Sequence, residues 1–593
     1  MLKKFLERAD ADDSVYVSEV REAFQQEGCH PFHCHVKLHD GSTRCFPLLL
    51  PDFSPGSERN FVASYVHAML YNIISSLGAV KIDIYIDSRN KDIVVLTEEL
   101  DEVFQTTYPK EERTGYGKCL NVNERMLATL YEAGSRFAFH TYDIAQEPPV
   151  SDVLPIHPHT DIFGQLPSIS QEKIVMGMDI GGTDVKLVAS IKGHLAIFKE
   201  YDWFPAGFTR AEQFLDPLLM LTRLMRAATC LYAQNRENDI DKTALDRYAS
   251  WEHMEKGIEA MENAAGENLH GFDAIGLCFP DVVVRNLIVG GETYKTRGMR
   301  GNKDLDYELQ FSRIASFGDK LKMFVVPEGS VLLTNDGPMA AFTTAVEMAS
   351  AGQDMSTGFF AHTLGTELGT GWVRPDGSIP EIPLEVYNFI IDLGSYRQKE
   401  HEPDDIRSIN NFNTGLVGTL QKYACQSGVF RLAARNLPAQ ASSVLQEAFD
   451  KGFFVRVGDK IIVPTKPTDM RKPCLEFFMK KASEPGQDAC ADIFRHIGES
   501  LGVCWLETEF ILHPETKERT LFGRMVKDSV CFNLLNEGAT KIVPGLIQHA
   551  ADGNLAHTRL MKELEKHPDY TVAQFAQAVG AVYYGCLSFV STS

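Results

Sequence analysis

A double glycine between two apolar runs is the first place where this chain could bind a ligand. Residues 174–191, IVMGMDIGGTDVKLVASI, predict two β-strands that pair as a hairpin and turn at Gly181 and Gly182. Glycine lets a phosphate approach bare backbone N–H groups, and Thr183 adds a hydroxyl donor. Asp179 can hold a magnesium ion through a water molecule. The stretch predicts a phosphate-binding hairpin, with an ordinary Asp-Gly turn as the alternative interpretation.

An Asn-Asp pair offers a second kind of chemistry. Residues 331–334 are apolar and predict a short strand, and Pro338 suits the first turn of a helix that begins at Asn335 and Asp336. An acid between a strand and a helix lies where ligands bind in α/β folds. Phosphoryl transfer needs a base there to accept the proton of the attacking hydroxyl. We predict that Asp336 is this base; the alternative is that it only caps the helix.

A second glycine-rich loop follows the apolar run 359–364, which predicts another strand. Small and hydroxyl residues recur in this loop: Gly365, Thr366, Gly369, Thr370 and Gly371. It is a second candidate for binding phosphate through the backbone. Two glycine-threonine hairpins in one chain also indicate two related halves.

Together the three stretches resemble the ROK family of sugar kinases and their repressor relatives. The family motif D-I-G-G-T-x-x-K corresponds to Asp179–Lys186, its Asn-Asp pair to Asn335 and Asp336, and its T-L-G-T-G-x-G-G-G loop to residues 363–371. The resemblance covers about residues 173–585. It implies an α/β protein with a two-lobed actin-like ATPase (ribonuclease H-like) fold and a cleft between the lobes. It also implies ATP-dependent phosphorylation of a hexose or related sugar, with Mg²⁺.

The resemblance assigns roles to individual residues. Asp336 would be the general base, and Asn335 and Asp281 would contact the sugar. The residues implied in binding ATP are Asp179 (through Mg²⁺ and water), Gly181, Gly182, Thr183, Lys186, Gly365, Thr366, Gly369 and, near the adenosine, Gly523.

The chain departs from the family at several of these positions. Glu367 replaces a glycine and would repel the phosphates; we expect its side chain to point to solvent, with coordination of magnesium or loss of ATP binding as alternatives. The sugar-contacting G-E-x-G-H motif is absent, and its acid should fall near Glu385, with Glu381 as a substitute; both acids could instead be ordinary exposed residues. The family's zinc ligands are missing as well, so we expect no structural zinc.

The length of 593 residues exceeds what one core supports, so several domains are expected. We predict an N-terminal α/β domain over 1–143, a linker with five prolines over 144–172, a first lobe over 173–330 and a second lobe over 331–593. We expect the N-terminal domain to fold independently and to be dispensable for chemistry, because it lies outside the resemblance.

The predicted elements of the N-terminal domain are helices at 13–26 and 58–76 and strands at 32–38, 44–50, 80–86 and 93–96. In the first lobe we expect a helix at 209–235, a helical insertion at 237–269 and a strand at 272–284.

The sequence CHPFHCH, residues 29–35, contains residue types that bind metals. Phe32 and Cys34 alternate with His33 and His35, however, as in a strand with one buried face. The spacing matches no zinc template, and we therefore favour the strand interpretation.

The composition of the chain restricts the binding partners and the cellular compartment that we expect for the protein. The net charge is −22 overall and −10 over residues 1–165, where 15 Lys and Arg face 25 Asp and Glu, so nucleic acid and anionic membranes are disfavoured. No apolar run is long enough for a membrane span. Twelve cysteines without a C-x-x-C pair predict reduced thiols in a cytoplasmic protein. The expected partner is a small-molecule sugar, with a homodimer as a candidate assembly.

Two rival functions stay open at this stage. The first is a sugar-responsive regulator, although such relatives carry a basic DNA-binding domain that the acidic N-terminal segment does not resemble. The second is a catalytically degenerate protein that keeps the fold, which Glu367 and the missing G-E-x-G-H motif would explain.

Overall fold

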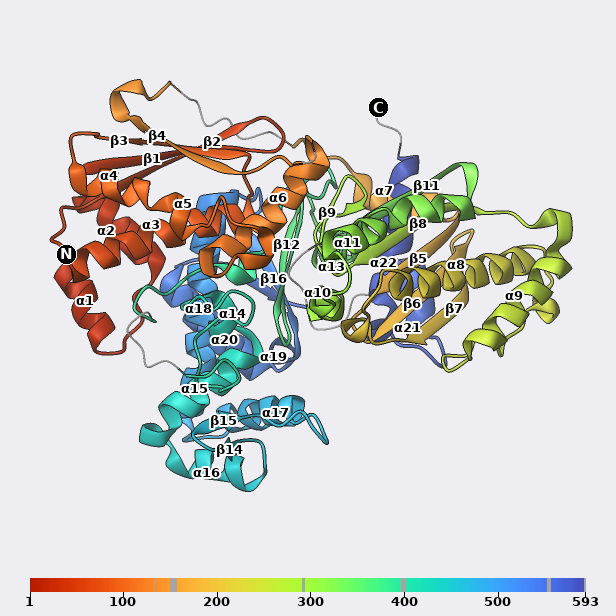
Figure 1. The fold of residues 1–593 in the computed structure, drawn as a ribbon. Helices are drawn as coiled ribbons and strands as arrows, with labels where there is room; N and C mark the ends of the chain where they lie inside the picture. Colours follow the sequence, from red (N-terminus) through yellow and green to blue (C-terminus); the bar gives the residue numbers. More distant parts are fainter. Residues whose placement is uncertain (133, 150–156, 291–293, 396–400, 552–555, 591–593) are drawn as a thin grey trace. The chain divides into compact units, whose positions relative to one another are not determined.

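The computed structural model of the protein describes residues 1–132, 134–149, 157–290, 294–395, 401–551 and 556–590. The chain forms two compact units, and each is assembled from separated segments (Figure 1). Unit 1 contains Met1–Ile156, Ala361–Thr370 and Ile382–Asp552, and unit 2 contains His157–Phe360, Gly371–Glu381 and Gly553–Ser593.

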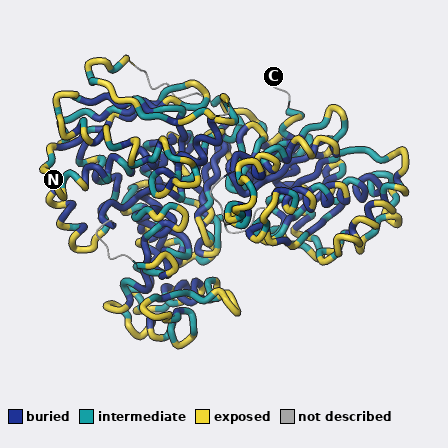
Figure 2. The backbone as a smooth tube through the Cα atoms, in the orientation of Figure 1, coloured by how far each residue is buried: buried dark blue, intermediate teal, exposed yellow. Residues whose placement is uncertain are grey.

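Unit 2 is built on a five-stranded sheet with the order β11-β8-β5-β6-β7. Its strands are β5 (Ile174–Ile180), β6 (Asp184–Ile191), β7 (His194–Asp202), β8 (Phe272–Phe279) and β11 (Val325–Asn335). The first three form an antiparallel meander, and β8 and β11 extend the sheet in parallel with β5. This order and these directions are those of ribonuclease H-like folds. Strand β8 is buried almost throughout (Figure 2), as expected for a strand covered on both faces.

Helices cover both faces of this sheet. Helix α22 (Val572–Cys586) packs against β5, β6 and β8, and helix α8 (Glu212–Ala233) packs against β6 and β7. Two glycines bring α22 into direct contact with the strands: a Cβ at Gly177 would lie 1.9 Å from Ala578 O, and one at Gly276 would lie 1.8 Å from Ala581 O. Both positions therefore exclude any side chain.

A second sheet repeats the strand order of the first. It has the order β13-β12-β16-β17, and its strands are β12 (Phe359–Leu364), β13 (Leu368–Val373), β16 (Glu518–Gly523) and β17 (Ile547–Ala550). Strands β16 and β17 run parallel to β12, as β8 and β11 do to β5. Within the part of the chain that the structure describes, the two sheets correspond strand by strand, except that β7 has no counterpart in this second sheet. This duplication confirms the predicted actin-like ATPase fold and the pairing of the two glycine-threonine hairpins as equivalent turns.

The N-terminal residues form a four-stranded α/β layer within unit 1. The sheet order is β2-β1-β3-β4, with strands β1 (His30–Lys37), β2 (Thr43–Leu50), β3 (Lys81–Ile86) and β4 (Ala138–Asp143). Helices α2 (Val17–Glu27) and α3 (Ser57–Ser76) agree with the predicted helices to within a few residues at their ends. Helix α3 is apolar around most of its circumference and is buried accordingly.

This layer packs against later parts of unit 1 rather than standing alone. Helices α2 and α3 both contact α18 (Asp488–Leu512), and Arg21 forms an ion pair with the buried Glu507 of that helix. The Asn72 amide exchanges two hydrogen bonds with the backbone of Ile390, at 3.1 and 2.8 Å. The compact units therefore do not follow the predicted domain boundaries. The physical reason is α3, whose second apolar face needs a partner from outside the N-terminal sheet.

Two local predictions were wrong. Residues 93–96 lie in helix α4 (Lys91–Glu98) instead of a strand, because the Asn90 side chain accepts hydrogen bonds from Asp92 N and Ile93 N and caps the helix. The predicted linker contains helix α7 (Ile162–Ser170), whose Phe163 ring packs against Phe342. Residues 150–156 of that linker lie outside the described residues.

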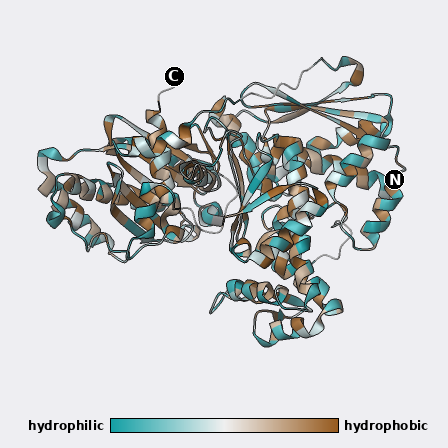
Figure 3. Cartoon of the chain, turned by 180° about the vertical axis from the view of Figure 1, so that it is seen from behind, coloured by the Kyte–Doolittle hydropathy of each residue, from teal (hydrophilic) through white to brown (hydrophobic). Residues whose placement is uncertain are grey.

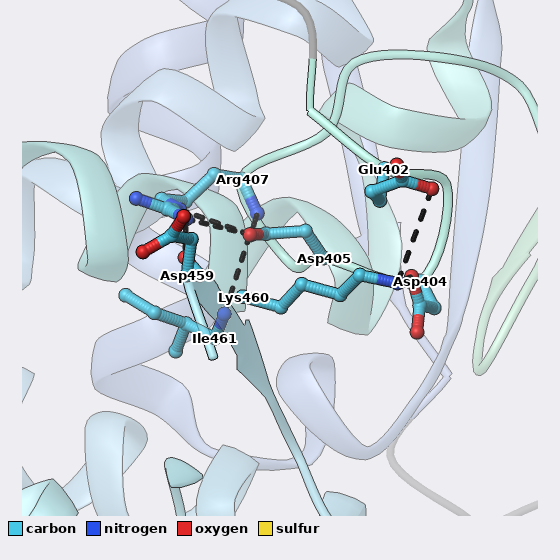
Figure 4. Close-up of polar contacts among 7 residues, drawn as sticks. All are labelled: Glu402, Asp404, Asp405, Arg407, Asp459, Lys460 and Ile461. Carbon is cyan, nitrogen blue, oxygen red and sulfur yellow. Dashed lines mark hydrogen bonds and ion pairs between the residues drawn. The ribbon is translucent and has the colours of Figure 1, made fainter. Parts of the chain in front are cut away.

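A small hairpin in unit 1 is attached by polar contacts. Strands β14 (Val455–Val457) and β15 (Lys460–Ile462) are held to the preceding loop by the buried Asp405, which binds Arg407 at 2.6 Å and accepts from Ile461 N at 3.2 Å (Figure 4). Lys460 contacts Asp404 at 2.9 Å. The apolar side chain of Ile461 in β15 is buried as well, so polar and apolar contacts together hold the hairpin.

The remaining elements complete the two units. Figure 3 shows brown hydrophobic stretches on their interior elements and teal hydrophilic stretches on their outlying helices.

No helix in the described part of the chain is long and apolar enough to span a membrane. Ten of the twelve cysteines are buried, and all twelve are free thiols. The other helices and strands are α1 (Leu2–Asp10), α5 (Leu100–Val103), α6 (Lys118–Leu130), α9 (Trp251–Ala265), β9 (Val283–Val284), β10 (Leu287–Ile288), α10 (Arg297–Gly301), α11 (Tyr307–Ala315), α12 (Phe317–Leu321), α13 (Asp336–Ser350), α14 (Leu420–Tyr423), α15 (Cys425–Gln440), α16 (Ser442–Asp450), α17 (Arg471–Ala482), α19 (Arg524–Lys527), α20 (Ser529–Ile542) and α21 (Arg559–Glu565).

Candidate functional site

Asp336 is the first residue of helix α13, at the carboxyl end of strand β11. The preceding residue, Asn335, caps the helix, because its Oδ1 accepts from Gly337 N at 2.9 Å. The alternative interpretation of Asp336 as the cap is therefore wrong, although its Oδ1 also accepts from Gly337 N at 2.9 Å. Its side chain is 45% exposed and offers its second oxygen to a ligand.

Lys295 lies beside Asp336 and was missed from the sequence. Its Nζ is 3.7 Å from Asp336 Oδ2. The same side chain lies against the first hairpin, since a Cβ at Gly182 would be 3.2 Å from Lys295 Cε. Lysine is a common ligand of phosphate, and this one connects the predicted base with the predicted phosphate site. The sequence signal was a basic run, Lys295 to Arg300, in an acidic chain.

The hairpin of residues 181–183 has the properties that a phosphate requires. Its turn closes with Gly181 N donating to Asp184 O at 2.9 Å, and Trp203 Nε1 donates to Gly181 O at 2.9 Å. The N–H groups of Gly182 and Thr183 have no acceptor among the residues that the structure describes. Thr183 is exposed. A phosphate could therefore accept two backbone hydrogen bonds here.

Asp179 is the last residue but one of strand β5, close to this turn, and is half-buried. The pKa of its carboxyl is raised to about 6, mainly by desolvation and to a smaller extent by the charges of Asp336 and Asp184, while the Cys278 thiol and Lys186 oppose the rise. Cys278 Sγ donates to Asp179 Oδ1 at 3.2 Å. Lys186 Nζ binds Asp184 Oδ1 at 2.5 Å. The carboxylate oxygens of Asp179 are of the type that a hard divalent cation such as Mg²⁺ prefers.

Asp281 belongs to the same group of residues. Its backbone O accepts from Asn335 Nδ2 at 2.7 Å, so Asn335 joins the ends of β8 and β11 as well as capping α13. The Asp281 side chain is 3% exposed. It lines a small pocket together with Gly181 and Lys295, and the apolar walls of this pocket include Trp203, Phe214 and Phe279. Sequence reasoning missed this pocket, because its walls come from five separate stretches of the chain.

The second hairpin lies in unit 1 and turns through residues 365–367. Gly365 N donates to Glu367 O at 3.2 Å, and Gly365 O accepts from Gln426 N at 3.2 Å. Thr366 and Glu367 are both exposed, in agreement with the expected direction of Glu367 toward solvent. Gly369 belongs to strand β13, and only the Thr363 side chain would approach a Cβ placed there, at 3.6 Å.

Two further glycines, Gly523 and Gly371, lie where the backbone of a neighbouring segment leaves no space for a side chain. Gly523 ends β16 with a φ of +117°, and a Cβ there would lie 2.2 Å from Leu364 O, directly before the second hairpin. Gly371 is required in unit 2, where a Cβ would lie 2.4 Å from Gly337 O at the start of α13. Gly523 thus keeps β16 close to the loop that sequence reasoning associates with nucleotide.

The two candidates for the sugar-contacting acid belong to different units. Glu381 is exposed in unit 2, and its Oε1 accepts from Arg285 N at 2.9 Å. Glu385 is half-buried in unit 1, where its N donates to Ser75 O at 3.1 Å and its Oε2 accepts from Asn388 Nδ2 at 3.1 Å. The predicted site residues that the structure brings together in unit 2 are Asp179, Gly181, Gly182, Thr183, Lys186, Asp281, Asn335 and Asp336. Those in unit 1 are Gly365, Thr366, Gly369, Glu385 and Gly523.

Comparisons with known proteins find sugar kinases among solved structures. No protein-family model and no curated protein matches the chain. The structure of a ROK-family glucokinase from Streptomyces griseus, in complex with glucose and AMPPNP, is 14% identical, covers 69% of this chain and 98% of its own, and gives a TM-score of 0.36. The ROK hexokinase from Thermus thermophilus is 15% identical, with coverages of 70% and 99% and a TM-score of 0.37. Glucokinase from Balamuthia mandrillaris, in complex with glucose, is 11% identical, with coverages of 73% and 100% and a TM-score of 0.33.

Proposed function

We propose that the protein transfers the γ-phosphoryl group of ATP to a hydroxyl group of a hexose or related sugar in the cytoplasm. The observation that supports this most is the arrangement around Asp336. Its half-exposed carboxylate lies at the start of α13, with Oδ1 accepting from Gly337 N and Oδ2 facing Lys295. The resemblance of the three sequence motifs to sugar kinases supplies the acceptor class.

Each residue has a defined part in this reaction. The Asp336 carboxylate accepts the proton of the attacking hydroxyl. The backbone N–H groups of Gly182 and Thr183 bind phosphate oxygens, and Lys295 places its positive charge between these oxygens and Asp336. Asp179 would hold Mg²⁺ through water, and this ion supplies charge neutralisation of the phosphates when bound. The Gly365–Glu367 hairpin is the equivalent phosphate-binding turn of the second sheet.

A phosphorylation screen over hexoses, hexosamines and their N-acyl derivatives tests this function. Asp336→Asn should lower kcat by about 10² to 10⁴-fold, the usual contribution of a general base, and should leave sugar binding within about threefold. The matched control is Asp488→Asn, because Asp488 is also the first residue of a helix and is exposed.

Two outcomes would contradict the proposal. An Asp336→Asn variant with kcat within threefold of wild type would remove Asp336 from the role of base. A wild-type protein that binds both ATP and a sugar in calorimetry but transfers no phosphate would be a degenerate member of this fold.

A further inference from the structure

The part of the CHPFHCH motif that the strand interpretation leaves unexplained is its beginning. His33 and His35, later in the motif, both bind Glu147, at 3.0 and 2.9 Å. Cys29 and His30 instead converge on Asp52: His30 Nε2 is 2.7 Å from Asp52 Oδ1, and Cys29 Sγ is 3.8 Å from Asp52 Oδ2. A thiol, an imidazole and a carboxylate thus meet at one end of the N-terminal sheet.

The backbone places these three residues together. Strands β1 and β2 are antiparallel with His30 opposite Leu50, so the residue before β1 and the residues after β2 lie at the same end. Cys29 N donates to Leu50 O at 3.1 Å and fixes the first of them. Gly28 is required for this path, since a Cβ there would lie 2.3 Å from Phe24 O. The position of the cluster follows from the sheet register and from one obligatory glycine.

The ligand atoms are close enough to share one ion. One ligand atom from each residue lies within 4.8 Å of the other two. The side chain of His30 is 23% exposed and that of Asp52 is 89% exposed, so solvent and ions reach the cluster. Among the twelve cysteines, Cys29 is the exposed one, while Cys45 is half-buried and the others are buried.

The order of the groups argues against a nucleophilic cysteine. In a Cys-His-Asp nucleophile the imidazole stands between the thiol and the carboxylate, so that it can accept the thiol proton. Here the carboxylate of Asp52 contacts both other groups, through different oxygens. Three different ligand atoms within 4.8 Å of one another, with the carboxylate in the middle, suit the chelation of a cation better than the relay of a proton.

We propose that Cys29, His30 and Asp52 bind a divalent transition metal of the Zn²⁺ type. Sulfur, nitrogen and oxygen ligands together favour a borderline-soft ion over Mg²⁺ or Ca²⁺, which take oxygen alone. Three protein ligands leave a fourth tetrahedral position open to water or to an external ligand. The site is separate from the proposed sugar kinase chemistry: it belongs to unit 1, and none of its residues serves the Asp336 group.

Titration of the tag-free full-length protein with Co²⁺, after treatment with a chelator, tests the proposal. One equivalent should produce a thiolate-to-cobalt charge-transfer band, and Zn²⁺ should displace it. Cys29→Ser should abolish the band, and His30→Asn and Asp52→Asn should each weaken binding at least tenfold. The matched control is Cys45→Ser, which alters the half-buried thiol of the neighbouring strand and should change nothing.

Thiol alkylation gives an independent readout of the same site. In the wild type, Zn²⁺ should slow the labelling of Cys29 at least tenfold, and in Asp52→Asn it should not. Circular dichroism of the metal-free variants checks that they fold. The proposal is overturned if the wild type gives no band, if Cys29→Ser keeps it, or if His30→Asn and Asp52→Asn bind as tightly as wild type, which would mean capture by the thiol alone. Sugar kinase activity does not enter any of these measurements.

Discussion

Lys295 Nζ lies 3.7 Å from Asp336 Oδ2, and the stem of the same side chain lies against the backbone of Gly182. One flexible cation therefore contacts both the group proposed to take the proton and the turn proposed to bind phosphate. Two charges of opposite sign at this separation attract appreciably even at a half-exposed site, so each helps to hold the other in place.

Replacing this lysine should impair catalysis more than binding of the sugar. Lys295→Met keeps most of the side-chain volume but removes the charge, and we expect kcat to fall by about 10² to 10³-fold, as when one electrostatic donor is removed from a transition state. Steady-state kinetics and sugar calorimetry measure the two effects. Lys303→Met is the control, because Lys303 is exposed nearby in the chain. Loss of sugar affinity with unchanged kcat would contradict the role.

The first hairpin should tolerate no side chain at its second glycine. Gly182→Val would push Lys295 aside and fill the space beside the free N–H groups, so ATP affinity should fall at least tenfold while sugar affinity is kept. Calorimetry with each ligand gives both values. Gly301→Val is the control, since nothing lies within 4 Å of a Cβ there. Unchanged ATP affinity in a folded Gly182→Val variant would refute phosphate binding at this turn.

Glu367 should matter little, although the resemblance predicts glycine at its position. Its side chain is exposed, and an exposed carboxylate is well screened by water. Glu367→Gly should therefore change kcat/KM for ATP by less than about tenfold, equivalent to about 1.4 kcal/mol. A large gain would reveal an electrostatically impaired phosphate site, whereas a large loss would indicate that the carboxylate binds the metal ion.

Asp179 should make the protein less stable as the pH rises. Its pKa is raised to about 6 from an ordinary value of 3.8, so the folded state binds a proton more tightly than the unfolded state. The contribution of Asp179 to the free energy of unfolding is then highest below about pH 4 and decreases as the pH rises to about 6. Asp179→Asn removes this decrease, which amounts to at most about 3 kcal/mol because one pKa unit corresponds to about 1.4 kcal/mol.

Denaturation of wild type and Asp179→Asn at pH 4.5 and 7.5 measures this difference. The variant should gain stability relative to wild type only at the higher pH, while it loses Mg²⁺-dependent activity. Asp319→Asn, an exposed aspartate, serves as the control. A stability difference that is the same at both pH values would show that Asp179 is charged throughout.

Deletion of residues 1–143 should yield an insoluble protein, contrary to the expectation from the sequence. The deletion uncovers the apolar surface of α18 that α2 and α3 cover, and it leaves the buried Glu507 without Arg21. Soluble expression and circular dichroism of the shortened chain test this. A folded, active fragment would show that the N-terminal layer is an accessory.

A single substitution examines the same interface in the intact chain. Arg21→Met should destabilise unit 1 by about 3 to 5 kcal/mol, the usual result of leaving one partner of a buried ion pair alone. Arg8→Met, at a half-exposed pair with Glu19, should cost less than about 1 kcal/mol.

The parts of the fold and the site that follow from the sequence are those with local causes. The hairpin at Gly181 and the helix start at Asn335 are encoded by a few adjacent residues whose conformations allow little choice. The same holds for helix α3. The prediction of a strand at residues 93–96 was wrong because a run of β-branched residues favours a strand, whereas the Asn90 cap here favours a helix.

What could not be predicted depends on contacts across long stretches of chain. Lys295 comes close to Gly182 only when the segment after β10 folds back toward the first hairpin. The integration of the N-terminal layer depends on pairs such as Asn72 with Ile390, which are 318 residues apart. Neither a period nor a motif reports such pairs, because each partner looks ordinary in its own segment.

The pairing of Arg21 with Glu507 also has a consequence for folding during synthesis. The two residues are separated by 486 positions, and at 5 to 20 residues per second roughly 25 to 100 s pass between their emergence from the ribosome. During that interval α3 presents an apolar surface with no partner yet made. We therefore expect chaperones to bind the N-terminal segment during this interval. Slower or interrupted translation lengthens the interval and should increase aggregation of the nascent chain.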